Sequence, residues 1–90
     1  MYIIAEAYNN RGSVKSDLGD KQGAIANYNE AIRLNPNYAD AYIGRGNAKY
    51  ALGDKQGAIA DYRESARLFQ QQGNTANYEN AQNLIRKLGG

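Results

Sequence analysis

The chain has 90 residues, a net charge of +2, and neither cysteine nor histidine. The lack of both residue types excludes disulfides, thiolate nucleophiles and histidine-based catalysis or metal binding, so we expect no enzyme activity, no cofactor and no metal site. The small net charge disfavours nucleic acid as a partner, and no apolar run reaches the roughly 20 residues of a membrane helix. Because Met1–Ile4 is too short for a signal peptide, we expect one cytoplasmic domain over residues 1–90.

Two helices are predicted in the first third of the chain. The first spans about 2–18, ends at Gly19, and is followed by Asp20 as the N-cap of a second helix over 21–34. The apolar side of the first helix is expected to contain Ile4, Tyr8, Gly12, Val14 and Leu18. The apolar face of the second helix is expected to contain Ala24, Tyr28, Ala31, Ile32 and Leu34.

Three more helices follow a break at residues 35–37. Pro36 cannot continue a helix, and Asn37 is expected to cap a third helix over 38–52. A fourth helix over about 55–72 has Asp54 as its cap and no proline at its end. The fifth, over 75–88, has an apolar stripe formed by Tyr78, Ala81, Leu84, Ile85 and Leu88, and its opposite face is polar.

The chain contains an internal repeat of 34 residues. Residues 5–38 and 39–72 align without gaps and are identical at 19 of 34 positions. Such a period is typical of stacked helical repeats, in which each unit buries its apolar face against its neighbours. Gly12 and Gly46 recur in the middle of a helix although glycine costs about 1 kcal/mol there. We therefore expect another helix to pass too close for a side chain.

The repeat resembles the tetratricopeptide repeat (TPR) family, whose pattern is W-x2-L-G-x2-Y, then A-x3-F, then P. The first copy reads Tyr8-x2-Arg11-Gly12-x2-Lys15, Ala24-x3-Tyr28 and Pro36, and the second keeps these residues except for Gln70 in place of proline. This resemblance implies an all-α solenoid of antiparallel helix-turn-helix units. Its expected parts are repeat 1 (5–38), repeat 2 (39–72) and a capping helix (75–88).

The resemblance also implies that the first helix of each repeat lines a concave groove that binds an extended peptide. The leading prediction is therefore a non-catalytic scaffold for protein–protein interaction. The predicted groove residues are Asn9, Asn10, Ser13, Asp17, Asp40, Ile43, Asn47 and Tyr50, with Glu6, Ser16, Gly44 and Ala51 beside them. Most of these positions differ between the two copies, as expected for a specific groove, but unconstrained exposed positions would also differ.

Two departures from the family pattern occur in both copies. Arginine replaces leucine and lysine replaces tyrosine, which forms a basic row of Arg11, Lys15, Arg45 and Lys49. These side chains can pack their methylene stems on apolar neighbours and keep the charge in water. A second interpretation is a site for an anion or, weakly, for RNA. Asp61 and Glu64 are expected to belong to a solvated charged face.

The first helix begins without a polar cap, and two repeats are fewer than the three that such stacks usually need. An alternative function is therefore self-association through Tyr2, Ile3 and Ile4, which would make the chain a homo-oligomer or the end of a longer array.

Overall fold

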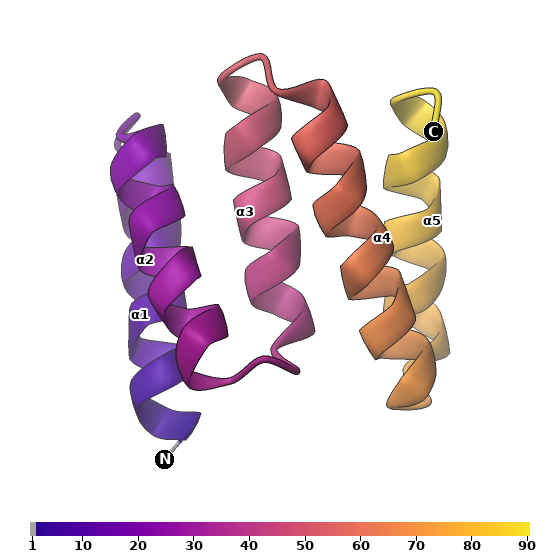
Figure 1. Ribbon diagram of the computed structural model, residues 1–90, viewed down its shortest axis with the longest axis horizontal. Coiled ribbons are helices and arrows are strands. Elements are labelled where there is room, and N and C mark those ends of the chain that lie inside the picture. Colours follow the sequence, from indigo (N-terminus) through magenta and orange to yellow (C-terminus); the bar gives the residue numbers. More distant parts are fainter. Residues whose placement is uncertain (1) are drawn as a thin grey trace.

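The computed structural model describes residues 2–90 as five α-helices joined by short turns, with no strand in that range (Figure 1). The helices are α1 (Tyr2–Asp17), α2 (Lys21–Leu34), α3 (Ala39–Ala51), α4 (Lys55–Gln71) and α5 (Thr75–Lys87). The all-α fold of helical hairpins is confirmed.

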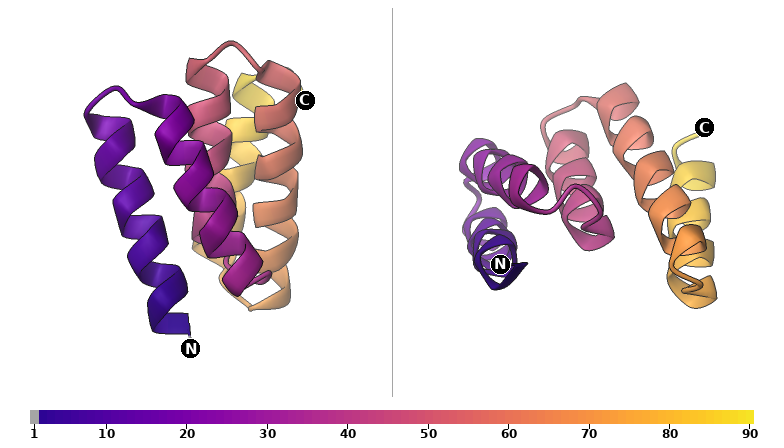
Figure 2. Two further views of the ribbon diagram at one scale, coloured as in Figure 1. Left: turned by 60° about the vertical axis from the view of Figure 1, so that its left-hand side comes forward. Right: turned by 60° about the horizontal axis from the view of Figure 1, so that its bottom comes forward.

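Neighbouring helices in the chain are neighbours in space. Each of the five packs on the next, and α1 also contacts α3. Viewed toward the helix ends, the two repeats and α5 follow one another across the molecule (Figure 2, right). The hairpin of α1 and α2 therefore forms one end of the stack, and α4 with α5 forms the other.

Capping side chains fix the helix starts. The Asp20 carboxylate accepts the Gly23 N–H at 2.9 Å, and Asp54 accepts the Gly57 N–H at 2.9 Å. Both caps were expected. The expected cap at Asn37 was wrong, because α3 begins after Tyr38 and has no side-chain cap. The Asn37 N–H is instead donated to the Asn35 side-chain oxygen at 3.2 Å, within the turn.

Small residues let the helices approach closely. A Cβ atom at Gly12 would lie 2.9 Å from Cε1 of Tyr28, and one at Gly46 would lie 2.8 Å from Cε1 of Tyr62. Both distances are too short for real contacts, which confirms the close approach predicted at these glycines. Gly44 of α3 also lies close to the Tyr28 ring, since a Cβ there would lie 2.5 Å from Cζ.

The apolar side expected for α1 was wrong at Ile4, Val14 and Leu18, but it was right at Gly12, and Tyr8 packs against the core. Ile4 and Val14 are each 57% exposed and Leu18 is 80% exposed, whereas Ala5 and Gly12 are buried. Helix α1 buries the side that meets α2 and α3, and nothing among residues 2–90 covers its other side. The stripe on α5 is confirmed by the burial of Ala81 and Ile85.

Candidate protein-binding surfaces

Most of the predicted groove residues are exposed on α1 and α3. We call this the α1–α3 surface, and its exposed members are Asn10, Ser13, Asp17, Asp40, Asn47 and Tyr50. Tyr50 is the most prominent apolar member, with 53% of its surface exposed. The two first helices of the repeats thus present polar side chains, with one aromatic residue among them.

Two asparagines on this surface differ in how they are held. The Asn47 side-chain oxygen accepts a hydrogen bond from the Tyr62 hydroxyl group, which fixes its orientation. Asn9 is half-buried, and its side-chain oxygen is buried without a hydrogen-bond partner among the described residues. Asn47 is therefore oriented by the fold, whereas Asn9 retains an unused acceptor.

Ile43 does not serve as an exposed apolar point of this surface. It is half-buried and packs against two core clusters, one around Tyr62 and one around Leu68. Ile43 therefore offers a ligand less apolar surface than expected, because core residues that include Tyr62 and Leu68 of α4 pack against it.

Carboxylates give the α1–α3 surface a negative character. Burial, followed by the charges of Glu6 and Asp40, raises the pKa of the Tyr38 hydroxyl group. Burial likewise raises the pKa of Tyr28, and the charge of Asp17 adds to the effect. Glu6, Asp17 and Asp40 are all exposed, so a ligand on this surface would meet acidic groups.

Arg45 and Lys49, the second half of the basic row, are paired with a carboxylate of the chain itself. Arg45 donates two hydrogen bonds to the Asp61 carboxylate, at 2.9 and 2.7 Å, and the Lys49 ammonium lies 3.2 Å from the same carboxylate. These contacts raise the pKa of Arg45, chiefly through its hydrogen bond to Asp61. Asp61 is only 4% exposed, so its assignment to a solvated charged face was wrong. Arg45 and Lys49 are therefore not available to a separate anion.

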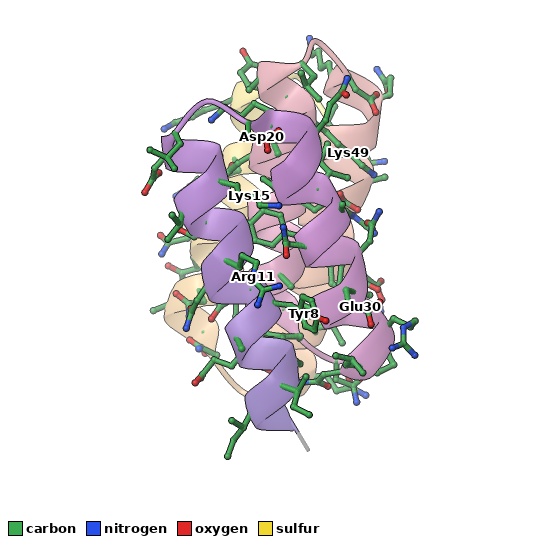
Figure 3. The ribbon with its side chains drawn as sticks, turned by 90° about the vertical axis from the view of Figure 1, so that its left-hand side faces the viewer. Tyr8, Arg11, Lys15, Asp20, Glu30 and Lys49 are labelled. Atoms are coloured by element: carbon green, nitrogen blue, oxygen red, sulfur yellow. The ribbon has the colours of Figure 1, made fainter. Side chains whose placement is uncertain are left out.

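The first half of the row has no such carboxylate. The residue that corresponds to Asp61 in repeat 1 is Asn27, whose side-chain amide donates to the Gly23 carbonyl group at 2.9 Å. Among residues 2–90, neither Arg11 nor Lys15 forms an ion pair. Figure 3 looks at this end of the molecule and shows Arg11 and Lys15 in a row along α1 with Tyr8. The two halves of the row are thus chemically different.

An aromatic contact places both arginines in the same way. The Arg11 guanidinium lies 5.1 Å from the centre of the Tyr8 ring, and that of Arg45 lies 5.2 Å from the Tyr42 ring. Only the acid is missing in repeat 1. The sequence did contain the signal, because Asn27 and Asp61 differ within otherwise similar segments, but no residue pattern indicated that Asp61 is buried.

The opposite end of the stack is also basic. Two shallow hollows lie there. One is lined by α5 and Gly90, and the other by α4, α5 and Gly90. The charged lining residues are Arg63, Arg67, Glu79 and Arg86. Arg67 is paired with Glu64 at 2.7 Å. We call this the C-terminal end surface.

Two family models match the chain. One, described as TPR repeat, covers residues 12–53, and the other, described as Tetratricopeptide repeat, covers residues 39–72. The chain belongs to the tetratricopeptide repeat family. Repeats of this family mediate protein–protein interactions, and their fold is a non-catalytic scaffold.

Solved structures share the TPR fold. A tetratricopeptide repeat domain protein from Salinibacter ruber is 17% identical, with a TM-score of 0.86 over 93% of this chain and 85% of that one. The crystal structure of MamA protein is 32% identical, with a TM-score of 0.67 over 93% of this chain and 48% of that one. The TPR chain thus spans about half the length of MamA. No curated protein gave a significant match.

Within residues 2–90, no group of three or more acidic side chains is placed to hold a metal ion. None of the helices in this range has the length and hydropathy needed to cross a membrane.

Proposed function

We propose that this TPR domain binds an extended peptide segment on the α1–α3 surface, and that the peptide carries a lysine or arginine. The observation that carries the proposal is the combination of a half-exposed Tyr50 with exposed carboxylates on α1 and α3. Aromatic residues dominate binding hot spots, and a carboxylate pairs well with a cationic side chain.

Asparagine supplies the remaining recognition chemistry. A side-chain amide can both donate to and accept from a peptide backbone. Asn47 stands three residues before Tyr50 on α3, and its side-chain oxygen is held by Tyr62, which leaves the NH₂ group to donate. An extended peptide running past α3 would thus find an aromatic anchor and a backbone donor on one side of the helix.

Selection from a random peptide library displayed on phage tests this proposal. Selected peptides, made synthetically, should contain lysine or arginine and should bind with one-to-one stoichiometry by calorimetry. Tyr50→Ala should weaken binding about tenfold or more, as expected for a hot-spot residue. Leu52→Ala is a matched control, because Leu52 is 49% exposed at the C-cap of the same helix. Equal losses in both variants, or peptides without basic residues, would contradict the proposal.

A second candidate is association through α1. The exposure of Ile3 (80%) and Ile4 (57%) favours it, because large apolar side chains at a helix end are often covered in a complex. The Tyr2 side chain lies outside the described side chains. Light scattering at high protein concentration, with Ile4→Asp for comparison, tests the homo-oligomeric form. A chain that stays monomeric would exclude a second copy as the occupant.

Binding of anions or RNA along the whole basic row has less support, because Arg45 and Lys49 are already paired.

A further inference from the structure

The outer side of α1 has the same register as a side of α3 that is buried inside the stack. We define the N-terminal end surface as Ile4, Ala7, Tyr8, Arg11, Val14 and Lys15. The positions 34 residues later include Ala41 and Ala48, which are both fully buried, whereas Ala7 is exposed and Val14 is 57% exposed. The matched positions therefore differ in burial because a helix packs on that side of α3, whereas no described helix packs on the outer side of α1.

In repeat 2 the cover is a helix. Ala41 belongs to a buried cluster with Ala24, Tyr28 and Ala31 of α2. Arg45 reaches the same helix, where its guanidinium donates to the Asn29 side-chain oxygen at 2.9 Å. This side of α3 thus accepts a helix whose small and aromatic residues pack on it. The same helix places the Asn29 acceptor beside Arg45.

Charge distinguishes the open surface from the covered one. In repeat 2 the carboxylate of Asp61 pairs with both Arg45 and Lys49 and offsets one of their two positive charges, but Asn27 leaves Arg11 and Lys15 without an internal counterion. The nearby Glu30 is paired with Arg33 at 2.5 Å, so that pair adds no net charge. An occupant that brings its own carboxylate would supply the missing charge.

We propose that the N-terminal end surface binds an acidic amphipathic α-helix of a partner protein, seated on α1 as α2 is seated on α3. The partner's apolar face packs over Ala7 and Val14, and its carboxylate pairs with Arg11 and Lys15. This surface is separate from the α1–α3 surface proposed for peptides.

A second copy of the chain is a poorer occupant on the same charge argument. Pairing α1 with α1 of another copy would bring the two Arg11–Lys15 pairs together. Stacking head to tail would place them against the C-terminal end surface, where the lining side chains of Arg63 and Arg86 outnumber that of Glu79. Like charges opposed across an interface cost binding free energy, so both self-associations are disfavoured.

The test uses peptides that copy the helix already seen on α3. The probes have the sequence of residues 20–37, with Asn29→Glu in one and Asn29→Lys in the other, because Asn29 is the residue that meets Arg45. Binding to the full chain is measured by NMR titration, which detects weak complexes and locates them. We expect the glutamate peptide to bind about fivefold or more tightly than the lysine peptide, with shifts on the outer side of α1, and the preference to shrink with salt.

Chain variants with matched controls complete the test. Arg11→Glu with Lys15→Glu should invert the peptide preference. Asn27→Asp should reduce it, because that change restores an internal carboxylate. Arg63→Glu, at the other end, should leave it unchanged, and Tyr50→Ala should leave it unchanged because it acts on the other surface.

Several outcomes would overturn the proposal. These are equal affinities for the two peptides, no shifts at millimolar peptide, or shifts confined to α4 and α5. A stable dimer by sedimentation equilibrium that dissociates on Val14→Asp would also overturn it, since it would identify a second copy as the occupant.

Discussion

At the scale of single residues, the buried Asp61 carboxylate joins two cations that differ in kind. Arg45 donates two hydrogen bonds to the carboxylate of Asp61, and the Lys49 ammonium lies 3.2 Å from Oδ2 of the same carboxylate. The side chains of the two cations retain 20% and 26% of their exposure, so the cluster is only partly screened from water. Removing the acid therefore leaves two cations close together in a poorly solvated place.

We predict that Asp61→Asn lowers the free energy of unfolding by about 2 kcal/mol, which is below the 3–5 kcal/mol typical of fully buried pairs because the cations are partly solvated. Urea unfolding followed by circular dichroism measures the change. The double variant with Arg45→Met should recover part of the loss, since fewer unpaired charges remain. A loss in the double variant equal to the sum of the single losses would show that the pair is not coupled.

Gly46 is required by the distance between α3 and α4. An alanine there should gain about 1 kcal/mol of helix propensity. The added Cβ, however, would lie 2.8 Å from the Tyr62 ring and 3.2 Å from Cβ of Asp61, and overpacking of this kind costs about 1–3 kcal/mol.

We therefore expect Gly46→Ala to destabilise the chain by about 1 kcal/mol. Asn10→Ala, at an exposed position of α1, should change stability by less than about 0.5 kcal/mol. Thermal unfolding of the two variants beside the parent chain provides the measurement. A Gly46→Ala variant that melts above the parent would refute the close approach.

At the scale of elements, α2 and α4 begin with the same N-cap arrangement. An aspartate precedes each helix, and a glycine three residues later donates its N–H to that carboxylate. A Cβ on Gly57 would lie 2.2 Å from the Asp54 carboxylate. Glycine is thus needed for the cap geometry and not for a left-handed backbone.

This relation predicts that the effects of two substitutions depend on each other. Asp54→Ala should cost about 1 kcal/mol through loss of the cap. Gly57→Ala should destabilise the parent chain, but it should stabilise the Asp54→Ala chain, where the clash is gone and alanine favours the helix. A double-mutant cycle by urea unfolding measures this coupling, and simple additivity would contradict it.

At the scale of the whole molecule, neutral tyrosines hold the layers together. Tyr28 and Tyr62 fill the space beside the helix glycines, and burial raises the pKa of both hydroxyl groups above the ordinary value of 10.0. In the pH range between the ordinary pKa and the raised one, the unfolded chain binds fewer protons than the folded chain. Stability must therefore fall as pH rises through that range.

We predict that the free energy of unfolding is nearly constant from pH 8 to about pH 9.5 and declines above about pH 10. Urea unfolding at several pH values measures it. Tyr28→Phe should make the decline shallower, because one of the responsible groups is removed. Stability that rises above pH 10 would contradict the assignment.

The sequence alone determined the period, the five helices, the turns at Gly19 and Gly53, and the close contacts at Gly12 and Gly46. All of these depend on local backbone preferences or on a spacing that recurs within the chain. Local signals failed at Asn37, because the start of α3 is set by the turn after Pro36 and not by the presence of a capping residue.

Only the tertiary structure decided which matched positions of the two repeats have the same burial and the same ion pairs. Repeat 1 and repeat 2 have the same arginine and lysine, yet one pair contacts the buried Asp61 carboxylate and the other has no carboxylate partner among the described residues. Likewise Ile43 is half-buried against two core clusters, whereas Ile4, Val14 and Leu18 are exposed. The physical reason is that burial depends on which neighbour covers a helix face, and no helix among the described residues covers the outer side of α1 as α2 covers the matched side of α3.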